Sequence, residues 1–148
     1  MKKITFLTIM FFTAAFFSQS LQAQTEAQRI ELCSKVAGNV TFLSSYPVQL
    51  HAARDGERPP NFKQATALRK GNVYRLTICT DEESTGEAVL QVFDEGRPLG
   101  STYDPRTGKT YQSFDIECTK TAGYVIIVTF RDGKEGSAVA ILSHVKTM

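Results

Sequence analysis

The sequence has few of the residues that usually build metal centres. It contains two histidines, His51 and His144, and three cysteines. None of them stands in a His-x-x-x-His or Cys-x-x-Cys spacing, which zinc sites commonly use. Two acidic runs, Asp81–Glu83 and Asp94–Glu95, lack the spaced ligands and the glycine of a calcium loop, so they are interpreted as solvated turns. We expect no metal and no cofactor.

Local motifs of the common hydrolases are also missing. The sequence has no Gly-x-Ser-x-Gly elbow that would present a nucleophilic serine. A catalytic cysteine needs a nearby base, and only His51 and His144 are available for that role. We therefore expect a protein without enzymatic activity, with an extracellular hydrolase as the alternative.

A long apolar run occurs only at the N-terminus. Two lysines precede the uncharged stretch 4–17, and the small, polar segment Ser18–Ala23 follows it. This order is typical of a secretory signal peptide that is cleaved before Gln24, and the run is too short and wrongly flanked for a membrane span. We predict an exported protein, periplasmic or secreted, with no transmembrane segment after removal of residues 1–23.

Removal of this leader also removes the net charge. The full chain has 17 basic and 15 acidic residues, and the leader holds two lysines and no acidic residue, so 17 − 2 = 15 basic residues balance the 15 acidic ones. Nucleic-acid binding needs a basic stripe and is excluded. The first cysteine, Cys33, is not at the cleavage position and is not preceded by a lipoprotein box, which favours a product without a lipid anchor.

Residues 24–148 have the length of one domain. A short helix is predicted over residues 24–38, because Thr25 can cap it and Gly38 is a suitable left-handed stop. The face that packs on the domain is expected to consist of Ile30, Cys33, Val36 and Ala37.

Beyond Gly38 apolar and polar residues alternate, which predicts strands over residues 39–148. Val40–Leu50 is interpreted as an edge strand interrupted at Tyr46-Pro47, since proline lacks the donor that a central strand needs. Tyr124–Phe130 is the most apolar run and is predicted to be a central strand covered on both faces. The other strands are expected at 62–68, 73–80, 88–94, 99–103, 114–118 and 138–145.

Short strands joined by turns, with no helix between them, predict a mainly β fold. The architecture is expected to be an antiparallel β-sandwich, jelly-roll-like, with a short N-terminal helix. In the strand 73–80, Tyr74, Leu76 and Ile78 should face the core.

Residues 68–143 resemble the bacterial pre-peptidase C-terminal domain. The resemblance is carried by Gly71-x-x-Tyr74-x-Leu76, Ala88-x-Leu90-x-Val92-Phe93-Asp94, Gly96-x-x-Leu99, Phe114-x-Ile116 and Gly123-Tyr124-x-Ile126-x-Val128. It implies a β-sandwich and a non-catalytic module, since such domains usually accompany secreted peptidases and other hydrolases. The segments 101–109 and 132–136 are similar to those of a group of small exported proteins of Gram-negative bacteria. This similarity does not indicate any particular activity.

The predicted export permits a disulfide among Cys33, Cys79 and Cys118. Any single pairing leaves one thiol over. Cys118 has the phase of core-facing residues and Cys79 the opposite phase, which argues against a Cys79–Cys118 bridge, whereas Cys33 on the helix can reach either one. Three buried, reduced thiols remain the alternative.

The strongest binding candidate is the loop from Tyr103 to Tyr111. Its two tyrosines flank Asp104, Arg106 and Lys109, and this combination of stacking faces and polar groups suits sugar or peptide ligands. The alternative is a rigid turn whose tyrosines pack on the sandwich.

We therefore predict a non-catalytic binding or interaction module whose partner is a protein or glycan of the bacterial cell envelope. The alternatives are the extracellular hydrolase and a structural subunit of an envelope assembly that pairs through the edge strand.

Overall fold

The computed structural model describes residues 18–148, and the apolar stretch of the predicted signal peptide lies outside them. Helix α1 (Ser18–Ala37) covers the predicted helix but begins earlier, so the predicted cleavage position before Gln24 lies within it. Thr25 is therefore inside the helix and not at its start. The predicted stop is confirmed: Gly38 has a φ of 85°, a conformation that glycine adopts without strain.

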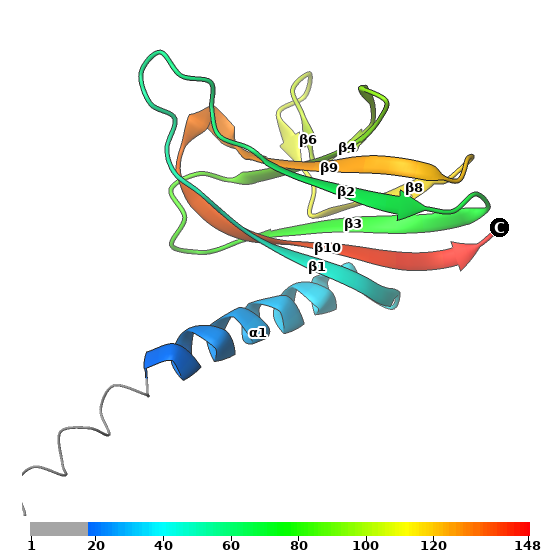
Figure 1. Cartoon of the computed structure of the whole chain (residues 1–148), viewed down its shortest axis with the longest axis horizontal. Helices are drawn as coiled ribbons and strands as arrows, with labels where there is room; N and C mark the ends of the chain where they lie inside the picture. Colours follow the sequence, from blue (N-terminus) through cyan, green and yellow to red (C-terminus); the bar gives the residue numbers. More distant parts are fainter. Residues whose placement is uncertain (1–17) are drawn as a thin grey trace, which may run out of the picture.

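The strands form two four-stranded antiparallel sheets that pack face to face (Figure 1). Sheet A has the order β1-β10-β3-β8, and sheet B has the order β2-β9-β4-β5. The elements are β1 (Thr41–Leu50), β2 (Phe62–Leu68), β3 (Asn72–Thr80), β4 (Ala88–Asp94), β5 (Arg97–Ser101), the short pair β6 (Tyr103–Asp104) and β7 (Lys109–Thr110), β8 (Ser113–Glu117), β9 (Ala122–Phe130), the 3₁₀ turn η1 (Arg131–Gly133) and β10 (Gly136–Thr147).

The order of the strands is that of a jelly roll. The two sheets contain eight strands among the described residues, since β6 and β7 form a separate pair. Counted in chain order without that pair, sheet A holds strands 1, 8, 3 and 6, and sheet B holds strands 2, 7, 4 and 5. Two Greek keys wound in this way produce a double-sheet jelly roll. The predicted mainly β, antiparallel sandwich with one N-terminal helix is confirmed.

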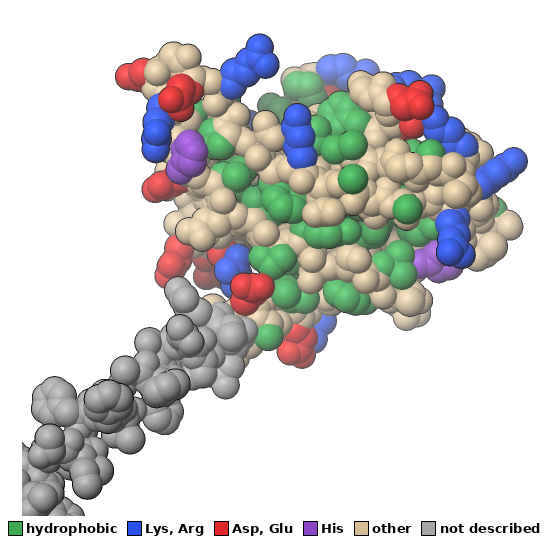
Figure 2. Space-filling view, in the orientation of Figure 1, with side chains coloured by type: hydrophobic (Ala, Val, Ile, Leu, Met, Phe, Trp, Pro, Cys, Tyr) green, Lys and Arg blue, Asp and Glu red, His purple; other side chains and the backbone are tan. Residues whose placement is uncertain are grey.

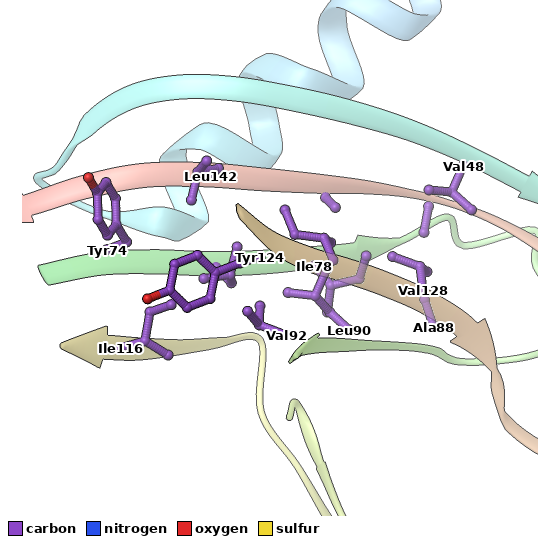
Figure 3. Close-up of a cluster of buried hydrophobic side chains, with 14 of the residues drawn as sticks. Val48, Tyr74, Ile78, Ala88, Leu90, Val92, Ile116, Tyr124, Val128 and Leu142 are labelled. Atoms are coloured by element: carbon purple, nitrogen blue, oxygen red, sulfur yellow. The ribbon is translucent and has the colours of Figure 1, made fainter. Parts of the chain in front are cut away.

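The core fills the space between the two sheets (Figure 3). In the central strands β3, β4 and β9, alternate residues point into this core, as the sequence predicted for Tyr74, Leu76 and Ile78 of β3. Leu90 of β4 and Ile126 of β9 are completely buried. Burial of these apolar side chains supplies the main favourable free energy of folding.

The prediction that Tyr124–Phe130 is a central strand is confirmed, but the prediction that it is covered on both faces is wrong. β9 does lie between two neighbours in sheet B, but its burial alternates, with Ile126 buried and Ile127 half-exposed. The strand that is covered on both faces is β10, where every residue from Ala138 to Ser143 is buried. Its inner face packs on sheet B and its outer face lies against α1, as the packing of Cys33 on Ile141 shows.

Strand β1 is an edge of sheet A, as predicted, because it pairs with β10 alone. The predicted interruption at Tyr46-Pro47 is wrong, since the strand continues through Pro47, which lies opposite Val139. An edge strand tolerates proline because one row of its N–H groups needs no partner in the sheet. Proline and a register shift between Phe42 and Ser44 both protect such an edge from pairing with another chain.

A disulfide and a set of hydrogen bonds are among the contacts that hold α1 on the outer face of sheet A. Cys33 forms a disulfide with Cys79 of β3, and their Cα atoms lie 5.8 Å apart. The Arg75 guanidinium donates one hydrogen bond of 2.8 Å to the Ala37 carbonyl and two, of 2.7 and 3.0 Å, to the Asp115 carboxylate. Among the pairings that the sequence left open, the structure thus contains Cys33–Cys79, and Cys118 is a free thiol in the core.

Candidate functional site

The loop singled out in the sequence forms a small hairpin, β6–β7. Gly108 has a φ of 71° and donates its N–H to the Asp104 carbonyl at 2.8 Å, which closes the turn. The Asp104 carboxylate accepts the backbone N–H of Arg106 at 2.9 Å and its Nε at 3.4 Å. The backbone hydrogen bond from Arg106, more than any other contact, holds the pKa of Asp104 below its ordinary value. Asp104 and Arg106 therefore serve first to shape the turn.

The base of this hairpin is fixed to sheet B by the buried residue Thr102. Its N–H donates to the Leu90 carbonyl at 3.0 Å, and its Oγ1 accepts the Leu90 N–H at 2.9 Å. On the other side, the Tyr111 N–H donates to the Thr102 carbonyl at 2.7 Å. The strand-to-hairpin junction is thus rigid, because each of these backbone groups has a buried or well-aligned partner.

Tyr103 and Tyr111 have different surroundings. Tyr103 is half-buried, and the guanidinium carbon of Arg131 lies 4.3 Å from its ring centroid, a cation–π contact. Arg131 also lies 3.5 Å from a carboxylate oxygen of Glu87. Tyr111 is 51% exposed. The ring that a ligand can reach freely is therefore that of Tyr111.

The structure thus divides the five predicted binding residues into two groups. Tyr103 and Asp104 have their main contacts within the domain, whereas Arg106, Lys109 and Tyr111 lie at the surface. The sequence did not predict that Arg131 and Glu87 lie near this hairpin. Arg131 is the first residue of η1, and Glu87 directly precedes β4. No local signal pointed to them, because only the folded chain brings these segments to the hairpin.

A second surface, which the sequence did not indicate, is the hollow between α1 and the outer face of sheet A. We call it the α1 groove, and its volume is about 1100 Å³. Its apolar part is formed by Leu32 and Val36 of α1, the Cys33–Cys79 disulfide and Val139. Val36 was expected on the packed face of the helix, but it is 43% exposed, and the packed face consists of Ile30, Cys33 and Ala37 instead.

The remaining lining of the α1 groove is polar, with four acidic residues and one basic residue, and it comprises Thr25, Glu26, Arg29, Gln49, Thr80, Asp81, Glu82, Glu83 and Gln112. Figure 2 shows Asp and Glu side chains gathered where the helix meets the domain. Arg29 Nε lies 2.8 Å from an Asp81 carboxylate oxygen, so one acidic side chain is paired. A smaller hollow of about 300 Å³ shares Asp81 and Glu83 with the groove.

The titratable groups with shifted pKa values do not gather at one place. Asp104 lies on the hairpin, and Arg75 lies on the outer face of β3, where the hydrogen bond to Asp115 raises its pKa. In the core, burial and the contact with Cys118 raise the pKa of Tyr124 to about 12. Active sites usually concentrate such shifts in one cleft.

Residues 18–148 contain neither a candidate cluster of metal ligands nor a candidate membrane-spanning helix. No group of three His, Cys, Asp or Glu side chains in this part of the chain is placed to hold a metal ion. No helix in the same part is long and apolar enough to cross a membrane.

Comparisons with known proteins show a likeness to solved structures but give no family. No protein-family model matches the chain, and no curated protein matches it. Among solved structures, the chain is similar to PliG of Aeromonas hydrophila, a periplasmic lysozyme inhibitor of g-type lysozyme, with a TM-score of 0.47 and 12% identity over 73% of this chain and 90% of that one. A likeness at this level carries no argument about function, and the resemblance to pre-peptidase C-terminal domains stays a prediction.

Proposed function

We propose that this protein is an exported, non-catalytic binding module, and that it contacts a protein or glycan of the cell envelope through the β6–β7 hairpin. One observation carries the proposal: the exposed ring of Tyr111 and the exposed Lys109, two positions apart in the chain, stand on a base that is fixed to the sandwich. An aromatic face beside a cation suits a sugar ring with an acidic substituent, or a peptide carboxylate.

The internal contacts of the hairpin also support this role. Ligand binding costs less conformational entropy when the binding loop is already ordered. The Thr102–Leu90 hydrogen bonds and the Arg131–Tyr103 contact order the base before any ligand arrives. A loop that served only as a connection would not need an exposed aromatic ring at its end, whereas loops on a rigid scaffold commonly carry binding residues.

The site is tested by screening the purified protein on an array of bacterial envelope glycans, in parallel with captured envelope proteins. We expect Tyr111→Ala to weaken binding to any ligand found by about tenfold or more, as expected for the loss of a central aromatic contact. Lys109→Ala should weaken the same binding to a smaller degree, and more at low than at high salt.

Phe42→Ala is the matched control, since Phe42 is an aromatic residue of similar exposure, 48%, that lies on β1 instead of the hairpin. It should leave binding unchanged. Equal losses in both variants, or a ligand whose binding Tyr111→Ala does not affect, would remove the hairpin from the proposal.

Export is tested separately. Intact-mass and N-terminal analysis of the protein recovered from its host should give a chain that begins at Gln24 and is found outside the cytoplasm. A chain that retains Met1–Ala23 in the cytoplasm would contradict export without bearing on the hairpin.

A further inference from the structure

We propose that the α1 groove binds a segment of a partner protein in which aliphatic side chains lie next to lysines or arginines. This second site lies on the outer face of sheet A and contains none of the five hairpin residues named above, although Gln112, which lines it, directly follows Tyr111 in the chain. The inference therefore goes beyond the function proposed above and does not depend on it.

The apolar part of the groove is a surface that the domain leaves uncovered. Leu32 is 63% exposed and Val36 is 43% exposed. The two lie four residues apart on α1, so their side chains form one continuous ridge. Beside this ridge the half-buried Cys79 adds a smaller apolar area, whereas Cys33 and Val139 line the floor of the groove and are each only 1% exposed. A contiguous apolar surface of this kind is characteristic of a place where another chain docks.

The disulfide makes this surface a permanent feature of the folded protein. It joins the C-terminal part of α1 to β3, so the helix and the sheet keep the separation that forms the groove. Arg75 fixes the C-terminal end of the same helix through the Ala37 carbonyl. A groove that exists before binding lowers the entropic cost of docking a partner.

The acidic part of the groove specifies the charge of the partner. Four carboxylates line it, from Glu26, Asp81, Glu82 and Glu83, against the single guanidinium of Arg29, so the described lining residues have a net charge of 1 − 4 = −3. The chain without its leader is formally neutral, so this local excess does not simply reflect the overall composition. Because Arg29 is already paired with Asp81, the carboxylates of Glu26, Glu82 and Glu83 are the ones that attract a cationic partner.

The charge and the size together favour a protein segment over other occupants. Acidic side chains repel the phosphates of anionic lipids and of nucleic acids. The volume of about 1100 Å³ lies at the upper end of the range for small-molecule pockets, roughly 300–1,000 Å³, and is large enough for several side chains of a protein segment. Aliphatic residues of the partner would lie along Leu32 and Val36, and its basic residues near Glu82 and Glu83.

The test uses fluorescence anisotropy with a labelled synthetic peptide of Leu-Leu-Lys-Lys repeats and the purified protein. Two comparison peptides are used. In one the lysines are replaced by glutamates, and in the other the leucines are replaced by serines. We expect the Leu/Lys peptide to bind at least about tenfold more tightly than either comparison peptide, because only it complements both parts of the groove. Its affinity should also fall as the salt concentration rises.

Variants of the protein locate this binding. Leu32→Ser combined with Val36→Ser should weaken it by about tenfold, and the matched control is Phe42→Ser with Leu43→Ser, an apolar pair of similar exposure on β1. Glu82→Lys with Glu83→Lys should weaken binding and remove most of its salt dependence, whereas Asp55→Lys with Glu57→Lys, in the exposed loop before β2, should change neither. All of these side chains lie at the surface, so the fold should be kept.

Several outcomes would overturn the proposal. These are equal binding of the Leu/Glu peptide, an unchanged affinity after the Leu32 and Val36 substitutions, or preferential binding to vesicles that contain phosphatidylglycerol. Self-association that only the Leu32 and Val36 substitutions abolish would instead identify a second copy of the chain as the occupant. Tyr111→Ala should leave peptide binding intact, so failure at the groove and failure at the hairpin can be distinguished.

Discussion

The central strands β9 and β10 occupy equivalent places in the two sheets but are buried differently. In β9, burial alternates from residue to residue, because only the inner face of sheet B is covered. In β10 six consecutive residues are buried, because α1 covers the outer face of sheet A. One helix therefore gives sheet A a second small core, made of Cys33, Val139 and Ile141, which sheet B lacks in the described part of the chain.

The largest expected effect is on the stability of these two strands. Ile126→Ala, Ile141→Ala and Leu142→Ala should each lower the free energy of unfolding by about 2–5 kcal/mol, because each removes a fully buried side chain. Ile127→Ala, on the half-exposed face of β9, should cost roughly 1 kcal/mol or less. Urea unfolding measures all four. A loss at Ile127 as large as that at Ile126 would mean that the outer face of sheet B is also covered.

Removal of the disulfide should have the next largest effect, and it concerns sheet A alone. Cys33→Ala combined with Cys79→Ala should lower the free energy of unfolding by about 2–4 kcal/mol, since the bridge closes a loop with a sequence separation of 46. Urea unfolding with and without reductant measures the loss. Reductant should destabilise the unmodified protein and leave the double variant unchanged, and thiol titration of the unreduced, denatured protein should count one thiol, Cys118.

The third effect concerns the end of α1. Arg75→Ala removes the hydrogen bonds to the Ala37 carbonyl and to Asp115 and should cost roughly 1–2 kcal/mol, a range reduced for partial exposure of the guanidinium. Hydrogen exchange should show faster opening of the last turn of α1 and no change in β9. Arg106→Ala, whose side chain is 89% exposed, is the control and should cost less than about 0.5 kcal/mol. Equal hydrogen-exchange rates in the last turn of α1 in the unmodified protein and in Arg75→Ala would contradict the role of Arg75 in holding this end of the helix.

The last expected effect occurs only at alkaline pH and is absent near neutral pH. The pKa of Tyr124 is raised to about 12 in the folded protein, above its ordinary value of 10.0, so folding favours the neutral phenol. The stability that this supplies is complete below pH 10 and is lost as the pH rises towards 12. The urea midpoint should therefore fall over this interval, and it should fall less steeply in Tyr124→Phe. An identical pH dependence in both proteins would assign the alkaline loss to other groups.

The sequence predicted the strands well because their signals are local. Alternation in β3 identified Tyr74, Leu76 and Ile78 as core residues, and the burial of these side chains confirms it. The strand at Phe62–Leu68 was predicted at its observed bounds, since turn residues flank it on both sides. The failures at Val36 and Pro47 have another cause: whether a helix face is covered, or a strand lies at an edge, depends on neighbours distant in sequence.

The candidate sites show the same division. The segment from Tyr103 to Tyr111 was predicted as a turn-rich loop because Asp104, Pro105 and Gly108 are turn residues between two tyrosines, but its folding into a hairpin was not predicted. The contact of Arg131 with Tyr103 and the α1 groove were not recognised, because each is formed by segments that only the fold brings together. No pattern within one segment can report a contact made with another.

By itself, therefore, the sequence determined the alternation of inward and outward residues in the strands, the placement of turns and the end of the helix at Gly38. These features depend on short-range sterics and on the order of apolar and polar residues along the chain. The tertiary structure decided which cysteines pair, which strand is covered on both faces and where a groove remains open. Cys33 and Val139, which meet beneath α1, are separated by 106 positions in the chain. Contacts over such separations depend on the packing of whole elements, and that packing is fixed only when the two sheets and the helix come together.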